Sequence, residues 1–115
     1  MLLYVNDKLV ADELIVAESF YDRFKGFMFA KSVRKGEGML FRGCNWIHSF
    51  FMKFPIDVLY LDRNNKIIDI TQGLDPWSLC MPRFKASQVI ELWPGSVEEN
   101  NITRGGVASV SVGMR

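Results

Sequence analysis

The chain has 115 residues, of which 49% are hydrophobic and 23% charged, so residues 1–115 fit one domain with a single core and are too few for two domains. Fourteen Lys and Arg against thirteen Asp and Glu leave a net charge of +1 with scattered cations, which disfavours nucleic-acid binding. No leader pattern and no apolar run of about 20 residues is present, so we expect a soluble, cytoplasmic protein without membrane association.

The first part of the chain predicts a β-hairpin followed by a helix. Leu2–Val5 and residues 9–17 have strand-forming compositions and flank the turn-rich tripeptide Asn6-Asp7-Lys8. Ser19 begins a capping pattern that predicts a helix start. The apolar residues that follow at helical spacing are Phe20, Phe24, Phe27 and Met28. This spacing predicts one amphipathic helix packed on a sheet.

The middle of the chain predicts four strands and a long loop. A short strand is expected at residues 39–41, and the alternation over residues 46–52 predicts a second. That second strand would place Trp46, His48, Phe50 and Met52 on one face. Residues 56–62 and 66–70 flank a turn and form the clearest hairpin. Two prolines and a glycine make residues 73–85 an irregular loop, of a length uncommon unless functional or mobile.

The last part predicts a strand at residues 89–92, a helical turn at Ser96–Glu99 and a final strand at residues 107–112. About seven short strands and one helix indicate an α+β fold that is mainly β. Connections of hairpin length favour antiparallel pairing. We therefore expect a compact, partly closed antiparallel β-barrel-like sheet with one packed amphipathic helix.

Polar side chains are set into the apolar segment of residues 44–62. An unpartnered buried polar group costs about 1–3 kcal/mol, so His48 and Asp57 must find partners, face water or serve a site. His48, the single histidine, is as suited to a structural role as to acid–base or ligand chemistry. Asp57 is suited to accepting backbone amides from a turn. In the alternative interpretation, Asp57 orients the His48 ring and the two form an acid–base pair.

Other chemistries find weaker support. Cys44 and Cys80 are 36 positions apart, which in a reducing compartment predicts two free thiols. The spacing Cys-x-x-x-His lacks a second close pair of ligands, so we expect no metal and no cofactor. Cys44 or Ser49 beside His48 lacks the surroundings of a catalytic nucleophile. In the loop of residues 75–85, Trp77, Arg83 and Phe84 could stack on a ligand and hold an anion, but we favour a loop that Trp77 pins on the core.

Four motifs carry a resemblance to a known family. They are the segments Arg23-Phe24-Lys25-Gly26-Phe27-Met28, Gly38-Met39-Leu40-Phe41, His48-Ser49-Phe50-Phe51-Met52-Lys53-Phe54-Pro55-Ile56-Asp57 and Val89-Ile90-Glu91-Leu92-Trp93-Pro94-Gly95. With these the chain resembles the bacterial and archaeal family called domain of unknown function 192. The resemblance implies a small, mainly β domain with a packed helix, and it assigns no activity. Relatives usually have Gly-Asp near the C-terminal turn, whereas here Gly105 precedes Gly106.

The resemblance marks a set of positions without giving them a role. Beside His48, Met52 and Asp57, these are Arg23, Gly26, Met28, Pro55, Glu91 and Gly95. Three hypotheses about function follow, and they leave open whether the protein is an enzyme. The first is a module that binds a small molecule or a protein partner in a pocket around His48, Met52 and Asp57, lidded by residues 75–85. The second is a hydrolase with His48 as general base and Asp57 as its orienter. The third is a structural interaction domain without a ligand site.

Overall fold

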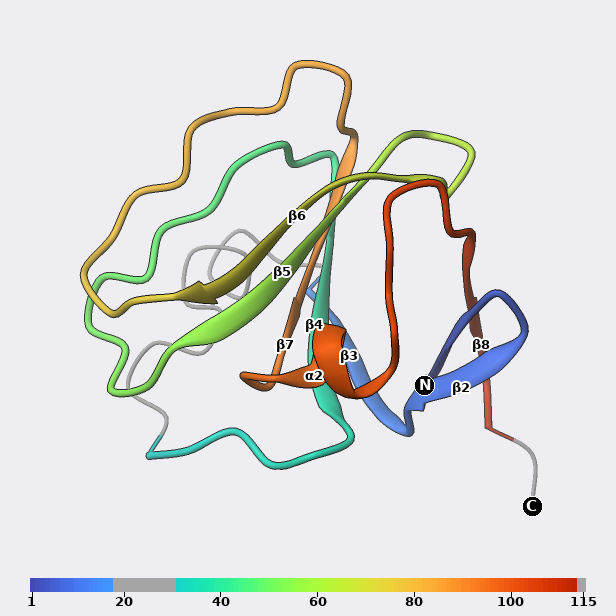
Figure 1. The fold of residues 1–115 in the computed structure, drawn as a ribbon, viewed down its shortest axis with the longest axis horizontal. Helices are drawn as coiled ribbons and strands as arrows, with labels where there is room; N and C mark the ends of the chain where they lie inside the picture. The colour runs from blue at the N-terminus through green and yellow to red at the C-terminus, as the bar shows by residue number, and fades with distance from the viewer. Residues whose placement is uncertain (18–30, 114–115) are drawn as a thin grey trace.

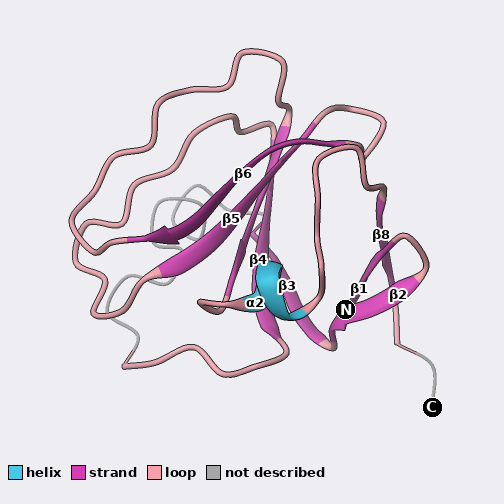
Figure 2. Cartoon of the chain, viewed as in Figure 1, coloured by secondary structure: helices cyan, strands magenta, loops and turns pink. Residues whose placement is uncertain are grey.

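The structure, a computed structural model, describes residues 1–17 and 31–113. In this part of the chain, eight strands form two sheets and one short helix lies beside them (Figure 1, Figure 2). The strands are β1 (Leu2–Val5), β2 (Lys8–Ala11), β3 (Glu13–Ala17), β4 (Glu37–Arg42), β5 (Ile56–Leu61), β6 (Ile67–Leu74), β7 (Gln88–Leu92) and β8 (Ala108–Ser111), and the helix is α2 (Ser96–Glu99). The mainly β, α+β class expected from the sequence is confirmed.

The strands are divided between a three-stranded sheet, in the order β2-β1-β8, and a five-stranded sheet, in the order β3-β4-β7-β5-β6. The hairpin predicted from residues 56–62 and 66–70 is confirmed as β5 and β6, which pair antiparallel. The helix predicted from residue 19 onward, together with Arg23, Gly26 and Met28, lies outside the described residues.

The segment of residues 9–17, predicted as one strand, is two strands that belong to different sheets. The break falls at Asp12, where the backbone N–H groups of Asp12 and Glu13 both donate to the carbonyl of Gly36, at 3.1 and 2.9 Å. Because these amides are bonded outside the first sheet, the chain leaves β2 at this point and enters the second sheet as β3.

One strand pair departs from the predicted antiparallel arrangement. β3 and β4 run parallel, with Leu14 opposite Gly38 and Val16 opposite Leu40. Parallel neighbours need a crossover of a dozen or more residues, and residues 18–36 supply that length. The hairpin-length connections elsewhere suggested antiparallel pairing throughout, and this long connection is the exception.

The core has two parts, one on each face of the five-stranded sheet. β5 is buried along its whole length because it lies between β7 and β6 and is covered on both faces. Leu59 and Leu61 join the cluster shared with the three-stranded sheet, whereas Val58 and Tyr60 point to the opposite face. On that opposite face the covering residues include Ile47, Met52 and Cys80, which come from two loops.

These two loops, residues 43–55 and 75–87, are called the paired loops below. They run side by side beyond the ends of the five-stranded sheet (Figure 1). Backbone bonds join them, from Cys80 N–H to the carbonyl of Ile47 at 3.0 Å and from Arg83 N–H to the carbonyl of Asn45 at 2.9 Å. The strand predicted over residues 46–52 is therefore wrong, and only one isolated antiparallel bridge, between His48 and Leu79, remains of it in the described structure.

Candidate functional site

Ser49 holds the paired loops together. Its side chain is fully buried, and its Oγ donates to the carbonyl of Asp75 at 2.5 Å and accepts the N–H of Ser78 at 2.8 Å. Its backbone N–H donates to the carbonyl of Ser78, and its own carbonyl accepts the N–H of Trp77, both at 2.8 Å. One residue thus satisfies several backbone groups of the opposite loop and fixes the position of the two loops relative to each other.

Five rings on the paired loops contact one another in a continuous series, called the aromatic row below. Its members in order are Trp46, His48, Phe50, Trp77 and Phe51. The centroid distances along the row are 6.3, 4.9, 6.1 and 4.5 Å, within the range of aromatic pairs that attract each other. The two Trp and two Phe side chains are nevertheless 37–60% exposed. The row is therefore an ordered but open surface.

The backbone beneath the row is strained at two positions. Phe51 and Trp77 have φ values of 64° and 62°, in the left-handed region that bulky residues rarely adopt. Such conformations cost on the order of 1–3 kcal/mol each and persist where the surrounding structure enforces them, often at functional sites. Their rings contact each other with the shortest centroid distance in the row. The two residues with a strained backbone are thus also the two whose rings are closest to each other.

His48 occupies the second position of the row and is partly buried. Its Nδ1 accepts the N–H of Phe50 at 3.2 Å, and its ring stacks on that of Phe50 at an interplanar angle of 28°. Burial lowers the pKa of His48 below its ordinary value. At neutral pH the ring is neutral, and because Nδ1 is the acceptor, the proton is on Nε2.

We expect the free energy of unfolding to decrease as the pH falls below about 6.5, the pKa of histidine in an unfolded chain. The lowered pKa means that the unfolded chain takes up this proton more readily than the folded chain. The contribution of His48 is complete above the unfolded pKa and is lost as the pH falls through the folded pKa. Urea titrations of the wild type and of His48→Gln at pH 7.5, 6.5 and 5.5 would measure it. If the free energy of unfolding changes with pH in the same way in both proteins, His48 does not have this role.

Asp57 acts as a brace. Its carboxylate is only 2% exposed; Oδ1 accepts the N–H of Gly73 at 2.9 Å, and Oδ2 accepts the N–H of Val97 at 2.9 Å and the hydroxyl of Ser96 at 3.3 Å. These bonds join β5 to the end of β6 and to the first turn of α2. The carboxylate thus accepts backbone amides, as its sequence context suggested.

None of the hydrogen bonds described above joins Asp57 to His48. Nδ1 of His48 is used by the N–H of Phe50, and both oxygens of Asp57 are used by donors from β6 and α2. Met52 is also buried, at 4% exposure, and belongs to the core cluster beneath the loops. Of the predicted site residues, His48 and Trp77 therefore lie together in the aromatic row, whereas Met52 and Asp57 are interior residues.

Arg83 is engaged within the fold. Its guanidinium donates to Asp69 at 2.9 Å, to the carbonyl of Met81 at 2.5 Å and to Thr71 at 3.3 Å, and it lies 4.2 Å from the centroid of the Tyr60 ring. Burial alone would lower the pKa of Arg83, but the hydrogen bond and charge of Asp69 raise it above its usual value. Asp69 also accepts a bond from Arg104. Arg83 thus anchors the loop of residues 75–87 to β6, and its bonds leave it poorly placed to hold an anion beside His48.

The remaining motif positions of the described chain lie in or near the strands. Pro55 precedes β5, and the buried Glu91 lies on β7 between Met39 of β4 and Val58 of β5. Gly95 has a φ of 89° at the start of α2, a left-handed conformation that glycine adopts without strain. Pro55 is the last residue of the first of the paired loops, whereas Glu91 and Gly95 lie outside both loops.

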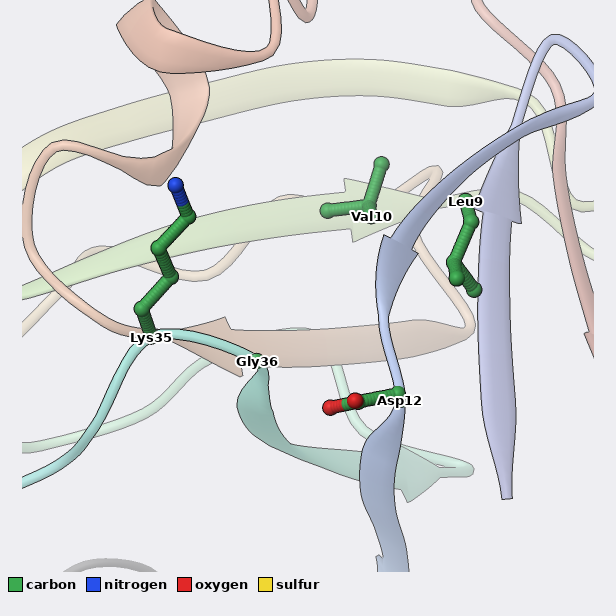
Figure 3. A pocket seen from close by; sticks show the side chains of 5 residues that line it. All are labelled: Leu9, Val10, Asp12, Lys35 and Gly36. Carbon is green, nitrogen blue, oxygen red and sulfur yellow. The ribbon is translucent and has the colours of Figure 1, made fainter.

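A cavity of about 200 Å³ opens at a different place, between β2 and the approach to β4 (Figure 3). It is lined by Leu9, Val10, Asp12, Lys35 and Gly36. The Lys35 side chain extends toward α2, where it forms an ion pair with Glu99. The residues predicted for a site do not line this cavity, and its one cationic lining side chain already has a partner.

Over residues 1–17 and 31–113, no three His, Cys, Asp or Glu side chains are grouped so as to hold a metal ion. Cys44 and Cys80 are free thiols, and the Cys44 Sγ contacts the carbonyl of Trp46 at 2.8 Å. No helix within the same ranges has the length and apolar character needed to cross a membrane.

Sequence reasoning missed the contributions of Ser49 and Phe51. It considers Ser49 only as a nucleophile, and the strand it predicts leaves Phe51 off the face of His48, whereas Phe50 is correctly placed beside His48. The signal that could have found them is composition, because residues 46–51 contain three large aromatic side chains and end in an exposed Phe-Phe pair. Aromatic side chains concentrated in a loop cannot all be buried by it.

Comparisons with known proteins agree with this fold. A family profile, DUF192, described as Uncharacterized ACR, matches residues 2–110. A UPF0127 protein from Pyrococcus furiosus is 30% identical over 91% of this chain and 92% of its own length, and one from Pyrococcus horikoshii is 36% identical over 69% and 70%. A crystal structure of a protein of unknown function from Novosphingobium aromaticivorans has a TM-score of 0.84 at 17% identity, covering 95% of this chain and 84% of its own.

A second crystal structure, of a putative transcription regulator from Sinorhizobium meliloti, has a TM-score of 0.80 at 21% identity over 94% of this chain and 89% of its own. Identities of 17% and 21% establish a common fold and carry no statement about activity.

Proposed function

This chain belongs to the DUF192 family, and we propose that it is a binding module whose recognition surface is the aromatic row on the paired loops. The single observation that carries the proposal is the row itself: five rings in mutual contact, with its Trp and Phe members 37–60% exposed. Monomeric proteins seldom leave large apolar patches open without a use for them. The Ser49 hydrogen bonds and the left-handed backbone at Phe51 and Trp77 hold the rings in place, so little ordering remains for the moment of binding.

A protein partner suits this surface better than a small molecule. The paired loops also expose Leu79, Met81 and Phe84, the last at 89%. Since an aromatic side chain presents about 150–250 Å², the exposed fractions of Phe84 and of the Trp and Phe rings of the row leave roughly 550 Å² of apolar surface open, and Leu79 and Met81 enlarge it. One side of a standard protein–protein interface has about this area. Small-molecule sites instead enclose most of the ligand surface.

In this proposal the predicted site residues divide into two roles. His48 and Trp77 are contact residues, and tryptophan is enriched at positions that dominate binding energy. Met52 and Asp57 are buried and support the loops from beneath. An enzymatic use of His48 would require an orienting group other than Asp57, whose carboxylate is occupied by Gly73, Ser96 and Val97.

The test begins with selection of peptides from a random library displayed on phage, using the wild-type protein as bait. Trp77→Gly removes the most exposed of the Trp and Phe rings of the row and suits the φ of 62°, so its fold should be retained. We expect selected peptides to bind the wild type and to lose about tenfold or more in affinity for Trp77→Gly, because truncated hot-spot residues cost about 2 kcal/mol or more. Isothermal titration calorimetry measures the difference.

The matched control is Ile15→Ala, which removes an equally exposed apolar side chain from β3, outside the paired loops. This variant should bind the selected peptides as the wild type does. Peptides that bind Trp77→Gly as tightly as the wild type, or a library that yields no specific binder, would contradict the proposal.

A further inference from the structure

Charge is distributed unevenly between the paired loops and the rest of the chain. The paired loops together with Arg42, the last residue of β4, contain four cations, Arg42, Lys53, Arg83 and Lys85, against one carboxylate, Asp75, and so have a formal net charge of +3. The whole chain has a net charge of +1, so the remaining residues sum to −2. Arg83 is neutralised by Asp69, but Arg42, Lys53 and Lys85 are exposed. Three exposed cations therefore lie in or directly next to the paired loops.

These cations lie close to the apolar side chains along the chain. Lys53 is two residues from Phe51, and Lys85 directly follows Phe84, the most exposed of the large apolar residues. Arg42 ends β4, where the next residue, Gly43, donates its N–H to the carbonyl of Ser87 at the base of the opposite loop. Each loop thus has an exposed lysine within two residues of an exposed phenylalanine.

From this arrangement, and resting on the proposed function, we infer that the partner is a protein segment with apolar side chains flanked by carboxylates. Complementary charge at the rim of an interface accelerates association and rejects wrong partners. A second copy of this chain fits poorly. Because Arg83 is paired with Asp69, each surface keeps Arg42, Lys53 and Lys85 against Asp75, and a two-fold interface would bring two surfaces of net charge +2 together.

The rigidity of the surface favours a protein segment over an anionic lipid bilayer. Ser49 fixes the two loops by hydrogen bonds of 2.5–2.8 Å, and the rings contact one another instead of extending separately. A fixed arrangement of rings provides complementarity to a defined surface. A fluid bilayer adapts to whatever side chains are inserted, so a fixed arrangement of rings does not strengthen binding to it.

The experiment uses the apolar core of a peptide selected as described above, synthesised once with four flanking Glu residues and once with four flanking Lys residues. Calorimetry at low and high salt measures both affinities. We expect the acidic peptide to bind about tenfold or more tightly than the basic one, with a difference that shrinks as salt screens the charges. The double variant Lys53→Glu/Lys85→Glu should reverse the preference.

The matched control is Lys8→Glu/Lys66→Glu, which makes the same change in net charge at exposed lysines outside the paired loops and should retain the wild-type preference. Suppose that the acidic and basic peptides bind the wild type with equal affinity and that neither binds Trp77→Gly. This result would overturn the inference and leave the proposed function standing. Trp77-dependent dimerisation in sedimentation equilibrium, or Trp77-dependent flotation with phosphatidylglycerol vesicles, would also overturn it by identifying another occupant. If no peptide can be selected at all, the proposed function itself fails.

Discussion

Replacing Asp57 by Ala is expected to lower the free energy of unfolding by about 3–5 kcal/mol, because it leaves buried donors without an acceptor. The carboxylate accepts the N–H groups of Gly73 and Val97 and the hydroxyl of Ser96, which is itself fully buried. Hydrogen bonds to a charged group contribute about 1.5–3 kcal/mol each. Urea denaturation followed by circular dichroism measures the loss.

Asp62 provides a matched control for this substitution. Its Oδ1 also accepts two backbone N–H groups, from Asn64 at 2.9 Å and Lys66 at 3.0 Å, but at the solvent-accessible turn between β5 and β6. Water can replace the carboxylate there, so Asp62→Ala should cost about 1 kcal/mol. Asp57→Asn, which keeps one acceptor oxygen, should lie between the two. Equal losses for Asp57→Ala and Asp62→Ala would contradict the brace.

Replacing Ser49 by Ala is expected to cost about 2–3 kcal/mol, since it removes the buried partner of the Ser78 N–H and of the Asp75 carbonyl. The effect should be concentrated in the paired loops, because β5 and β6 keep their own ladder of hydrogen bonds. Native-state hydrogen exchange should show reduced protection at Trp77 and Ser78 and little change in β5.

The same substitution links stability to binding. If the Ser49 hydrogen bonds hold the aromatic row in a fixed arrangement, Ser49→Ala should weaken the selected peptides although it removes no atom from the exposed surface. The control is Ser109→Ala, at an exposed position of β8. It should change the free energy of unfolding by no more than about 0.5 kcal/mol and leave the peptide affinity unchanged. Unchanged hydrogen exchange in the loops of Ser49→Ala would show that Ser49 does not hold them.

Local signals in the sequence predicted the elements that local interactions determine. The hairpin of β5 and β6 follows from two apolar segments around a short polar turn, in which Asp62 accepts the N–H groups of Asn64 and Lys66. The parallel pairing of β3 with β4 was missed because it depends on a connection of many residues, whose path no local pattern specifies. Asp57 was correctly expected to accept backbone amides, but its donors are 16 and 40 residues away.

The prediction of a strand at residues 46–52 is wrong for a physical reason. The alternation is real as far as Phe50, since Ile47 and Ser49 are buried while Trp46 and Phe50 are exposed. An extended backbone produces this alternation whether it pairs within a sheet or, as here, with another loop. At Phe51 the left-handed backbone ends the alternation, so that Met52 is directed into the core and away from His48. The sequence pattern alone predicts that His48 and Met52 share a face, because it does not reveal the left-handed backbone at Phe51.

The pairing of β1 with β8 determines when this fold can be completed in the cell. Leu3 is opposite Val110, so β1 must wait for more than a hundred further residues before its second edge is covered. At translation rates of 5–20 residues per second, this delay is on the order of 5–20 s, whereas a hairpin such as β1–β2 forms within microseconds. During that interval an unsatisfied strand edge is open to other nascent chains. Among the strand pairs of the described residues, β1–β8 spans the greatest length of chain, so the three-stranded sheet is completed last during synthesis.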